Sequence, residues 1–211
     1  MMIDAARRTE ALQLLSEAYP DAKPALNFKS PFELLVATML SAQCTDKQVN
    51  KVTEVLFADY NTPEAFAAID EATLEPYIHS CGFFRAKGKN ILAASRILCE
   101  RFGGVVPQTM EELTSLPGVG RKTASVVMAF AFDLPAIPVD THVFRVSNRI
   151  GLAQANDVEK TEMQLRENIP MEDWSKSHHW LIYHGRQVCS ARNPKCGSCV
   201  LKEVCDFAVH R

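Results

Sequence analysis

The segment 116–124, with the sequence Leu-Pro-Gly-Val-Gly-Arg-Lys-Thr-Ala, constrains the fold of this 211-residue chain more than any other feature. The proline and the two glycines in its first half are poorly tolerated inside a helix, yet both flanks read as helical. Thr109 and Glu112 form a capping-box pattern on one side, and an apolar run without helix breakers extends to Phe132 on the other. The segment therefore predicts two helices joined by a tight glycine hairpin.

The glycines of this hairpin suit the binding of a phosphate group. Gly118 and Gly120 allow close approach of the backbone, and the amides that open the second helix at Arg121 carry partial positive charge. Together they can bind a phosphate without any side chain. A P-loop is excluded, because Arg121 separates Gly120 from Lys122 and a helix rather than a strand leads into the segment. A plain Pro-Gly turn is the alternative, but the whole string resembles the helix-hairpin-helix motif, which binds the DNA backbone.

Composition and charge limit the class of protein. The chain is 47% hydrophobic and 23% charged, which is enough for a core in a globular protein. Its N-terminus lacks the apolar stretch of a signal peptide, and no apolar run approaches the roughly 20 residues of a membrane span, so we expect a cytoplasmic protein without a membrane partner. The net charge of −2 hides an uneven distribution, because basic residues outnumber acidic ones in segments 76–150 and 176–211. If those two segments share a face, that face suits nucleic acid.

Four of the seven cysteines lie in the last 23 residues: Cys189, Cys196, Cys199 and Cys205. In a reducing compartment the spacing C-x6-C-x2-C-x5-C indicates metal ligands rather than disulfides. Zinc is a common occupant of four-cysteine sites, but such sites usually pair two Cys-x-x-Cys knuckles, and here only Cys196 and Cys199 form one. An irregular loop bent at Pro194 and Gly197 favours a [4Fe–4S] cluster. From the spacing alone both metals remain open.

Helix signals dominate the chain, and no segment alternates long enough to predict a sheet, so the expected fold class is all-α. Asp4 is predicted to cap a first helix. Residues 30–33, Ser-Pro-Phe-Glu, form a capping box for a second helix that extends to about Cys44, and Asp46 is predicted to cap a third. Further helices are predicted after Thr62 and Asp70, over residues 85–102, on both sides of the hairpin, after Asp140, and over residues 158–168 and 175–185.

Two side chains are candidates for catalysis. Lys122 lies in the first turn after the hairpin, where the helix N-terminus and Arg121 disfavour an ammonium ion, and a neutral amine is what Schiff-base chemistry needs. Asp140 precedes a helix, and a capping carboxylate held by helix amides can stabilise a developing cation or accept a proton. The simpler alternatives are a phosphate-binding lysine and a purely structural N-cap. Together, a lysine nucleophile and a fixed carboxylate match displacement at C1′ of a sugar.

Four segments, in this order, resemble the endonuclease III family: Ser41-Ala-Gln-Cys-Thr-Asp46, Leu116–Lys122, Val139–His142 and the four-cysteine tail. The similarity extends from about Leu12 to Cys205. It implies a bifunctional DNA glycosylase and AP lyase that removes oxidised pyrimidines in base excision repair. It also implies two helical domains that flank a DNA-binding cleft. Residues 24–134 would form a six-helix domain with the hairpin at about 109–132, and residues 1–23 would join 135–211 in an iron–sulfur domain with its cluster loop at 189–205.

The resemblance also implies a role for single residues. Lys122 would attack C1′ of a flipped nucleotide and form the Schiff base that permits β-elimination, and Asp140 would assist loss of the base. Gln43 would fill the space vacated by the flipped nucleotide, and Phe83 would be the wedge between bases. The family usually has an aliphatic wedge, so the preference for lesion and opposite base stays open. The other implied DNA contacts are Gly118, Gly120, Arg121, Thr141, His142 and Arg186, and the four cysteines would hold a structural [4Fe–4S] cluster.

The implied partner is double-stranded DNA that contains oxidised pyrimidines or abasic sites, bound by a cytoplasmic, nucleoid-associated monomer. Two other classes of protein compete with this interpretation. An adenine-mismatch glycosylase shares the hairpin and a similar cysteine spacing but lacks the catalytic lysine that Lys122 supplies here. A non-catalytic DNA-binding protein with a metal-stabilised tail needs neither Lys122 nor Asp140 at these positions.

Overall fold

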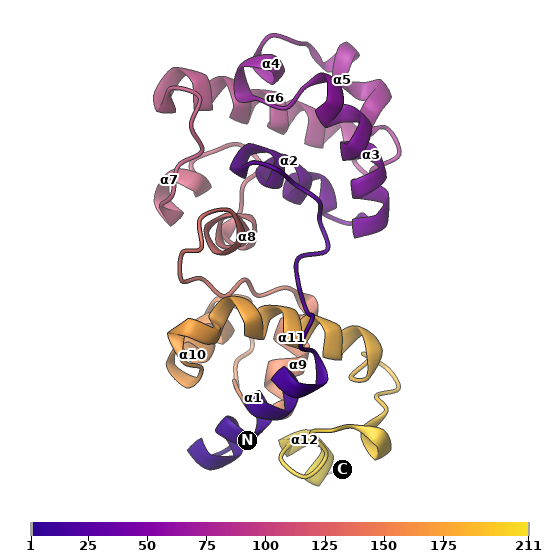
Figure 1. Cartoon of the computed structure of the whole chain (residues 1–211), viewed down its shortest axis with the longest axis vertical. Helices are drawn as coiled ribbons and strands as arrows, with labels where there is room; N and C mark the ends of the chain where they lie inside the picture. Colours follow the sequence, from indigo (N-terminus) through magenta and orange to yellow (C-terminus); the bar gives the residue numbers. More distant parts are fainter. Residues whose placement is uncertain (1, 211) are drawn as a thin grey trace. The chain divides into compact units, whose positions relative to one another are not determined.

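A computed structural model of the chain describes residues 2–210, and every regular element in this part is a helix. The prediction of an all-α fold is therefore confirmed. The helices divide between two compact units, shown in Figure 1, of which one comprises Pro24–Leu134 and the other comprises the residues before it and those from Pro135 onward. Within residues 2–210, no helix combines the length and the apolar character that crossing a lipid bilayer requires.

The unit Pro24–Leu134 is built around α2 (Pro31–Ser41), in which every residue from Phe32 to Leu40 is buried. Helices α3 (Asp46–Asp59), α6 (Phe84–Phe102) and α8 (Arg121–Ala131) pack against α2. Helices α4 (Pro63–Ala67) and α5 (Glu71–Ile78) pack on α6, and α7 (Met110–Thr114) packs on α8. Because α2 has neighbours on several sides, apolar residues occur on all its faces rather than along one stripe, and Glu33 and Thr38 are its buried polar residues.

Side-chain caps determine where most helices begin. Asp4, Ser30, Thr62 and Asp70 each accept a hydrogen bond from the backbone amide three residues further on, as the sequence predicts. The predicted cap of the third helix was wrong, because Thr45 and not Asp46 accepts the amide of Gln48, at 3.3 Å. Asp46 is instead the first residue of α3, where its negative charge still favours the helix N-terminus.

Two residues with left-handed backbone conformations shift helix ends from their predicted positions. Helix α2 ends at Ser41 rather than near Cys44, because the backbone leaves the helix at Ala42, where ψ is 115°, and Gln43 then adopts a φ of 52°. Helix α6 begins at Phe84, and Phe83 precedes it as the N-cap with a φ of 57°. Among residues 2–210, Asp133 is the one other non-glycine residue with a positive φ.

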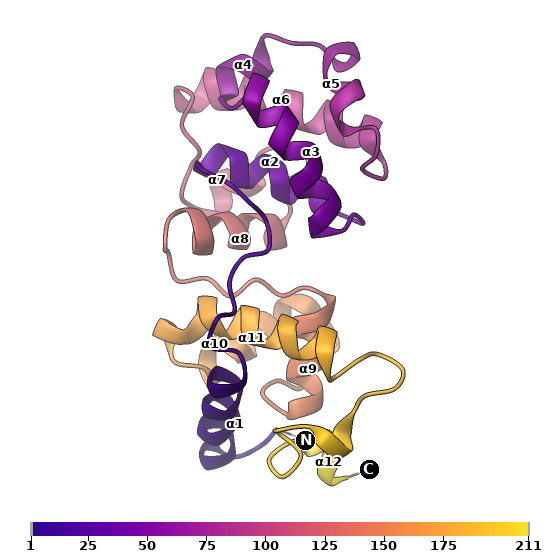
Figure 2. The same cartoon turned by 45° about the vertical axis from the view of Figure 1, so that its right-hand side comes forward.

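The other unit contains the first and the last helices of the chain (Figures 1 and 2). Helix α11 (Trp174–Gln187) packs against α1 (Ala5–Ala18) and α9 (Thr141–Ile150), and α10 (Val158–Asn168) and α12 (Asp206–Val209) pack against α9. Two 3-10 turns lie at Met171–Asp173 and Cys196–Ser198. The guanidinium of Arg7 donates to the carbonyl of Val204 at 2.8 Å, so residues near both ends of the sequence are joined within this unit.

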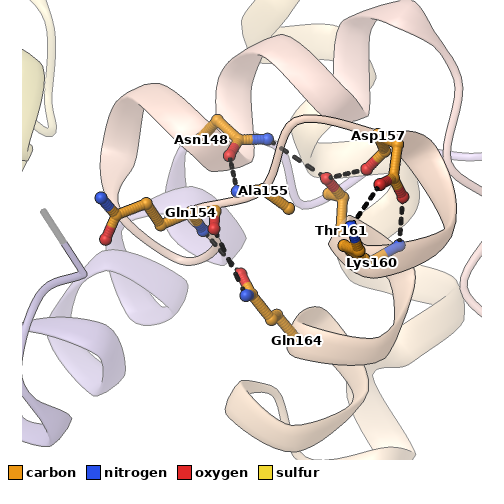
Figure 3. Close-up of polar contacts among 7 residues, drawn as sticks. All are labelled: Asn148, Gln154, Ala155, Asp157, Lys160, Thr161 and Gln164. Atoms are coloured by element: carbon orange, nitrogen blue, oxygen red, sulfur yellow. Dashed lines mark hydrogen bonds and ion pairs between the residues drawn. The ribbon is translucent and has the colours of Figure 1, made fainter.

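Hydrogen bonds fix the connection between α9 and α10, as Figure 3 shows. Asn148 near the end of α9 accepts the amide of Ala155 at 2.7 Å and donates to the hydroxyl of Thr161 on α10 at 3.3 Å. Asp157 caps α10 by accepting the amide of Lys160 at 2.8 Å. The connection therefore holds α10 beside α9 and supports the helix that begins after the candidate catalytic aspartate.

Candidate functional site

The hairpin between α7 and α8 has the capping box that the sequence predicts. The hydroxyl of Thr109 accepts the amide of Glu112 at 3.2 Å and donates to its carboxylate at 2.7 Å. Leu116 and Val119 are buried in the core of their unit, whereas Gly118 and Gly120 are exposed. The apolar residues therefore anchor the turn and leave its glycine backbone at the surface.

The two glycines serve different purposes. Gly118 has a φ of 76°, and a Cβ atom there would lie 2.8 Å from Cβ of Asn90 and 3.0 Å from Cε of Met39. Gly120 is the N-cap of α8 with a φ of −91°, and a Cβ atom there would meet no heavy atom within 4 Å. Gly118 is thus required by the fold, whereas the backbone at Gly120 faces space that a phosphate can occupy.

Lys122 is the second residue of α8 and is half-buried, like Arg121 before it. The helix that carries both residues is anchored by Ala124 and Val127, whose side chains are fully buried. The backbone of Lys122 is therefore fixed at the N-terminal end of a buried helix, next to the exposed hairpin.

Asp140 is the N-cap of α9, as predicted, and it is half-buried. Its Oδ1 atom accepts the backbone amides of both His142 and Val143 at 2.8 Å. Because one oxygen takes both of these bonds, the cap leaves Oδ2 available to a second partner. The carboxylate is thus held in a fixed orientation while it keeps the capacity to act on a substrate.

The first turn of α9 is tied to the segment that leads into the cysteines. The guanidinium of Arg145 lies 3.1 Å from Nδ1 of His142 and donates to the carbonyls of Gly185 at 3.1 Å and Cys189 at 3.2 Å. His142 is half-buried by this arrangement, whereas Thr141 is exposed. Arg145 was not predicted from the sequence as a functional residue, although an arginine five residues after a candidate catalytic aspartate is a usable signal.

Gln43 and Phe83 are brought together in the unit Pro24–Leu134. Both are exposed, Phe83 to 70%, and a Cβ atom at Gly82 would lie 3.6 Å from the carbonyl oxygen of Gln43. The same unit carries Lys122 and the hairpin. The other unit carries Asp140, Thr141, His142, the exposed Arg186 and the four cysteines.

The four cysteines of the tail lie close enough to influence one another electrostatically. Cys189 and Cys205 are buried, and Cys196 and Cys199 are half-buried. Burial raises the pKa of both Cys199 and Cys205. The other thiols, including Cys189 and Cys196, raise these pKa values further, because one thiolate disfavours a second nearby.

The four thiols are a donor set that fits a [4Fe–4S] cluster. In such a cubane each thiolate binds a different iron, so four cysteines satisfy the whole cluster. A zinc ion also accepts four thiolates, at about 2.3 Å from one point. The chemistry of the thiols therefore fits the cluster, and the family models described below bear on the choice between the two metals.

Arg149 organises the loop that begins at the first of these cysteines. Its guanidinium donates to the carbonyls of Ser190 at 2.7 Å and Ala191 at 2.8 Å, and it lies 3.6 Å from the sulfur of Cys189. It also stacks over the ring of Phe207, 4.9 Å from the ring centroid. Arg149 thus supports the thiolate and the loop around it, a role that the sequence analysis did not predict.

A buried histidine and tyrosine support another of the thiols. Burial lowers the pKa of His184 to about 4, so its imidazole is neutral at pH 7. Nδ1 of this ring lies 3.0 Å from the hydroxyl of Tyr19, and Nε2 lies 3.5 Å from the sulfur of Cys199. With the tyrosine donating to Nδ1, the imidazole presents its remaining N–H to the sulfur. The amide of Leu201 donates to the same sulfur at 3.4 Å.

Two family models match this chain. The model described as the HhH-GPD superfamily base excision DNA repair protein matches residues 36–171. The model described as the iron–sulfur binding domain of endonuclease III matches residues 189–205, which are the limits of the four-cysteine segment.

Known proteins of the same length are similar to the chain throughout. An endonuclease III of Synechocystis sp. is 52% identical over 203 residues, with 96% of this chain and 93% of the relative covered. An endonuclease III of Escherichia coli is 46% identical over 202 residues, with 96% of each protein covered. A solved structure of a trapped covalent intermediate between endonuclease III and DNA matches with a TM-score of 0.94 and 44% identity over 100% of this chain and 99% of that one. A thermostable thymine-DNA glycosylase shares the fold, with a TM-score of 0.88 at 21% identity over 99% and 100% of the two chains.

Proposed function

The chain belongs to the endonuclease III family of the HhH-GPD superfamily of base excision DNA repair proteins, and from this premise we propose that its Lys122 amine and Asp140 carboxylate perform the reaction. It is a DNA glycosylase and AP lyase that carries a [4Fe–4S] cluster. The observation that carries the proposal is that each unit holds one of these groups in a fixed position. Lys122 is the second residue of a buried helix beside an exposed hairpin, and Asp140 is held through a single oxygen.

Lys122 is the proposed nucleophile. Its neutral amine attacks C1′ of the flipped nucleotide, the bond from C1′ to the base breaks, and the base leaves with the bonding electrons and takes a proton from solvent. The attacking amine gives one proton to Asp140. The bond from C1′ to the ring oxygen then breaks, and this oxygen takes that proton as a protonated Schiff base forms between Nζ of Lys122 and C1′. Loss of a proton from C2′ breaks the bond between C3′ and oxygen, which cleaves the strand, and water releases the enzyme by hydrolysing the Schiff base.

Asp140 is proposed to stabilise the positive charge that develops on the sugar as the base leaves and to accept the proton that the attacking amine gives up. The two amides that hold Oδ1 orient the carboxylate before the substrate arrives, so little reorganisation is needed during the reaction.

The four cysteines Cys189, Cys196, Cys199 and Cys205 would hold the [4Fe–4S] cluster. When bound, the cluster supplies a covalent cross-link between four positions of the C-terminal segment. The guanidinium of Arg149 lies 3.6 Å from the sulfur of Cys189, and Nε2 of His184 lies 3.5 Å from the sulfur of Cys199, so both side chains are proposed to donate to a thiolate. Exposed Arg186 near this segment is proposed to contact a phosphate.

The residues proposed to contact DNA are exposed or half-buried, which supports the proposal. Gly118, Gly120 and Arg121 would bind a phosphate through the backbone at the start of α8, and Thr141 and His142 would contact the DNA beside Asp140. Gln43 and Phe83, adjacent and exposed, would replace and separate bases in the stack. The proposed substrate is double-stranded DNA with oxidised pyrimidines or abasic sites, and the protein is proposed to act as a cytoplasmic, nucleoid-associated monomer.

Borohydride trapping tests the proposed function. Incubation of the protein with a duplex that contains one oxidised thymine should release the base, and added borohydride should reduce the Schiff base to a stable adduct visible on a denaturing gel. An undamaged duplex of the same sequence is the control. Base release without any adduct would favour a monofunctional glycosylase of the adenine-mismatch type. Binding without base release would favour a non-catalytic DNA-binding protein.

Replacement of the two hairpin glycines by alanine should separate DNA binding from folding. Gly120→Ala should fold normally, because its φ suits alanine and its Cβ has open space. It should weaken binding to damaged and undamaged duplex alike by about tenfold, the effect of losing one or two amide–phosphate bonds. Gly118→Ala should instead lower the free energy of unfolding by at least roughly 1–2 kcal/mol, the cost of a left-handed alanine. Fluorescence anisotropy with labelled duplexes and thermal unfolding measure the two effects, and a loss of binding confined to damaged DNA would contradict the proposed role of Gly120.

A further inference from the structure

Two exposed residues with unusual backbone conformations lie next to each other in the unit Pro24–Leu134, and we call Gln43 and Phe83 the paired tips. Both have positive φ angles, 52° and 57°, which cost energy for residues other than glycine. The loops that carry them touch, since a Cβ atom at Gly82 would lie 3.6 Å from the carbonyl oxygen of Gln43. Backbone conformations of this kind persist only where the surrounding structure holds them.

Lys87 donates hydrogen bonds to two backbone carbonyls near the paired tips. Its Nζ atom donates to the carbonyl of Leu40 at 2.8 Å, and its backbone amide donates to the carbonyl of Phe83 at 3.1 Å. Leu40 belongs to the last turn of α2, three residues before Gln43. The bond to Phe83 is the ordinary main-chain bond of the first turn of α6, whereas the bond to Leu40 is made by the lysine side chain and joins α6 to the helix end that leads into Gln43.

The surroundings of Lys87 favour its bond to the carbonyl of Leu40 and do not favour a lysine at this position of α6 for the stability of that helix. The residue is 8% exposed, which is rare for lysine, and burial lowers the pKa of its ammonium group, partly offset by the thiols of Cys81 and Cys44. Lys87 lies near the N-terminus of α6, the end of a helix that disfavours a cation. Its partner carbonyl lies instead at the C-terminal end of α2, where the helix dipole favours one.

A second hydrogen bond joins the same two loops on their exposed side. The side-chain amide of Gln48, in the first turn of α3, donates to the hydroxyl of Ser80 at 2.8 Å. Gln48 follows Gln43, and Ser80 precedes Phe83. The segments that carry the paired tips are thus connected by the buried side chain of Lys87 and by the exposed pair of Gln48 and Ser80.

We propose that Lys87 is a positioning residue that holds Gln43 and Phe83 in one rigid arrangement, so that the two tips enter the duplex together when the damaged nucleotide leaves the stack. The inference rests on the proposed function, in which Gln43 fills the vacated space and Phe83 separates adjacent bases. An extruded nucleotide leaves unstacked neighbours, and support from only one tip would let the base return to the stack. Misplacement of positioning groups by about 1 Å can cost about a hundredfold in rate.

The test compares steps that need base extrusion with a step that does not. Lys87→Met keeps the apolar stem and removes the donor, and Lys89→Met, at an exposed lysine of the same helix, is the matched control. Lys87→Met should release an oxidised thymine from a duplex about tenfold to a hundredfold more slowly. Its cleavage of an abasic site in a single strand should stay within about twofold of the parent, because a single strand has no stack to leave. A 2-aminopurine next to the lesion should brighten on binding of the parent and of Lys89→Met but not of Lys87→Met.

A combined variant tests whether Lys87 acts through the paired tips. In a Phe83→Ala, Gln43→Ala background, Lys87→Met should cause no additional loss, and an additive loss would mean that Lys87 acts elsewhere. Equal losses of rate on duplex and on single strand would overturn the proposal that Lys87 is a positioning residue. So would a Lys87→Met variant with the same rates as Lys89→Met.

If Lys87→Met does not fold, Lys87→Gln replaces it in the fluorescence experiment, because glutamine keeps a donor on a shorter stem. Lys87→Gln should still reduce the 2-aminopurine signal, and an unchanged signal would reject the positioning role. A parent enzyme that releases no base would refute the proposed function instead, while the fluorescence of bound duplex would still report on Lys87.

Discussion

Lys122→Gln should abolish base release, strand cleavage and borohydride trapping together while the protein stays folded and binds DNA. Glutamine keeps a hydrogen-bonding end on a shorter stem at the second position of α8, where it is compatible with the helix, but it has no nucleophilic amine. Without a Schiff base neither covalent step can proceed, so the expected loss is at least about a thousandfold in the single-turnover rate. Gel assays on a duplex with one oxidised thymine measure the rate, and anisotropy measures binding.

Arg121→Gln is the matched control for Lys122→Gln, because it removes a neighbouring positive charge without removing the candidate nucleophile. It should weaken binding to DNA, and the difference in affinity from the parent should become smaller as the salt concentration is raised. The yield of trapped adduct at saturating protein should stay unchanged. A normal adduct yield from Lys122→Gln would show that another amine is the nucleophile and would refute the central assignment. Loss of the adduct from both variants would point to charge rather than to the amine.

Asp140→Asn should slow base excision by a factor on the order of 10² or more, the usual scale for a catalytic carboxylate. The amide oxygen of asparagine can still accept the amides of His142 and Val143, so the cap and the stability of α9 should survive. The loss should therefore appear in the rate at saturating enzyme rather than in the affinity for DNA, because the charge acts on the developing cation. Single-turnover kinetics with an oxidised thymine measure this rate.

A second capping aspartate offers a control for Asp140→Asn. Asp157 caps α10 by accepting the amide of Lys160 at 2.8 Å, in the same unit, and Asp157→Asn should leave the rate of base excision unchanged. If Asp140→Asn kept the parent's rate while Asp140→Ala lowered the melting temperature, Asp140 would be only a helix cap. The two asparagine variants together thus separate the loss of a charge from the loss of a cap.

Features that depend on neighbours within a few residues could be predicted from the sequence. The capping box of Thr109 and Glu112 and the cap at Asp140 belong to this class, and each is present as expected. The wrong prediction of a cap at Asp46 shows the limit of such local patterns. Thr45 and Asp46 are adjacent and both are good capping residues, so which of them caps α3 depends on the turn that precedes the helix.

Contacts between residues far apart in the chain could not be predicted in this way. Lys87 and Leu40 are 47 residues apart, and Arg149 and Cys189 are 40 apart, so no local pattern connects either pair. The left-handed conformations of Gln43 and Phe83 have the same origin, since neither residue type favours a positive φ by itself. The catalytic roles of Lys122 and Asp140 stay predictions that the substitutions above will test.

The unit that carries the cysteines is assembled from two separate stretches of chain, and this has a consequence for synthesis on the ribosome. Helix α1 emerges first, but its packing partner α11 begins only at Trp174, about 150 residues later. At roughly 5–20 residues per second, α1 waits on the order of ten seconds with Leu12 and Leu15 uncovered. During that wait Pro24–Leu134 is complete and can fold as a continuous segment. In the nascent chain the unit with the hairpin and Lys122 is therefore expected to fold before the unit that carries the four cysteines.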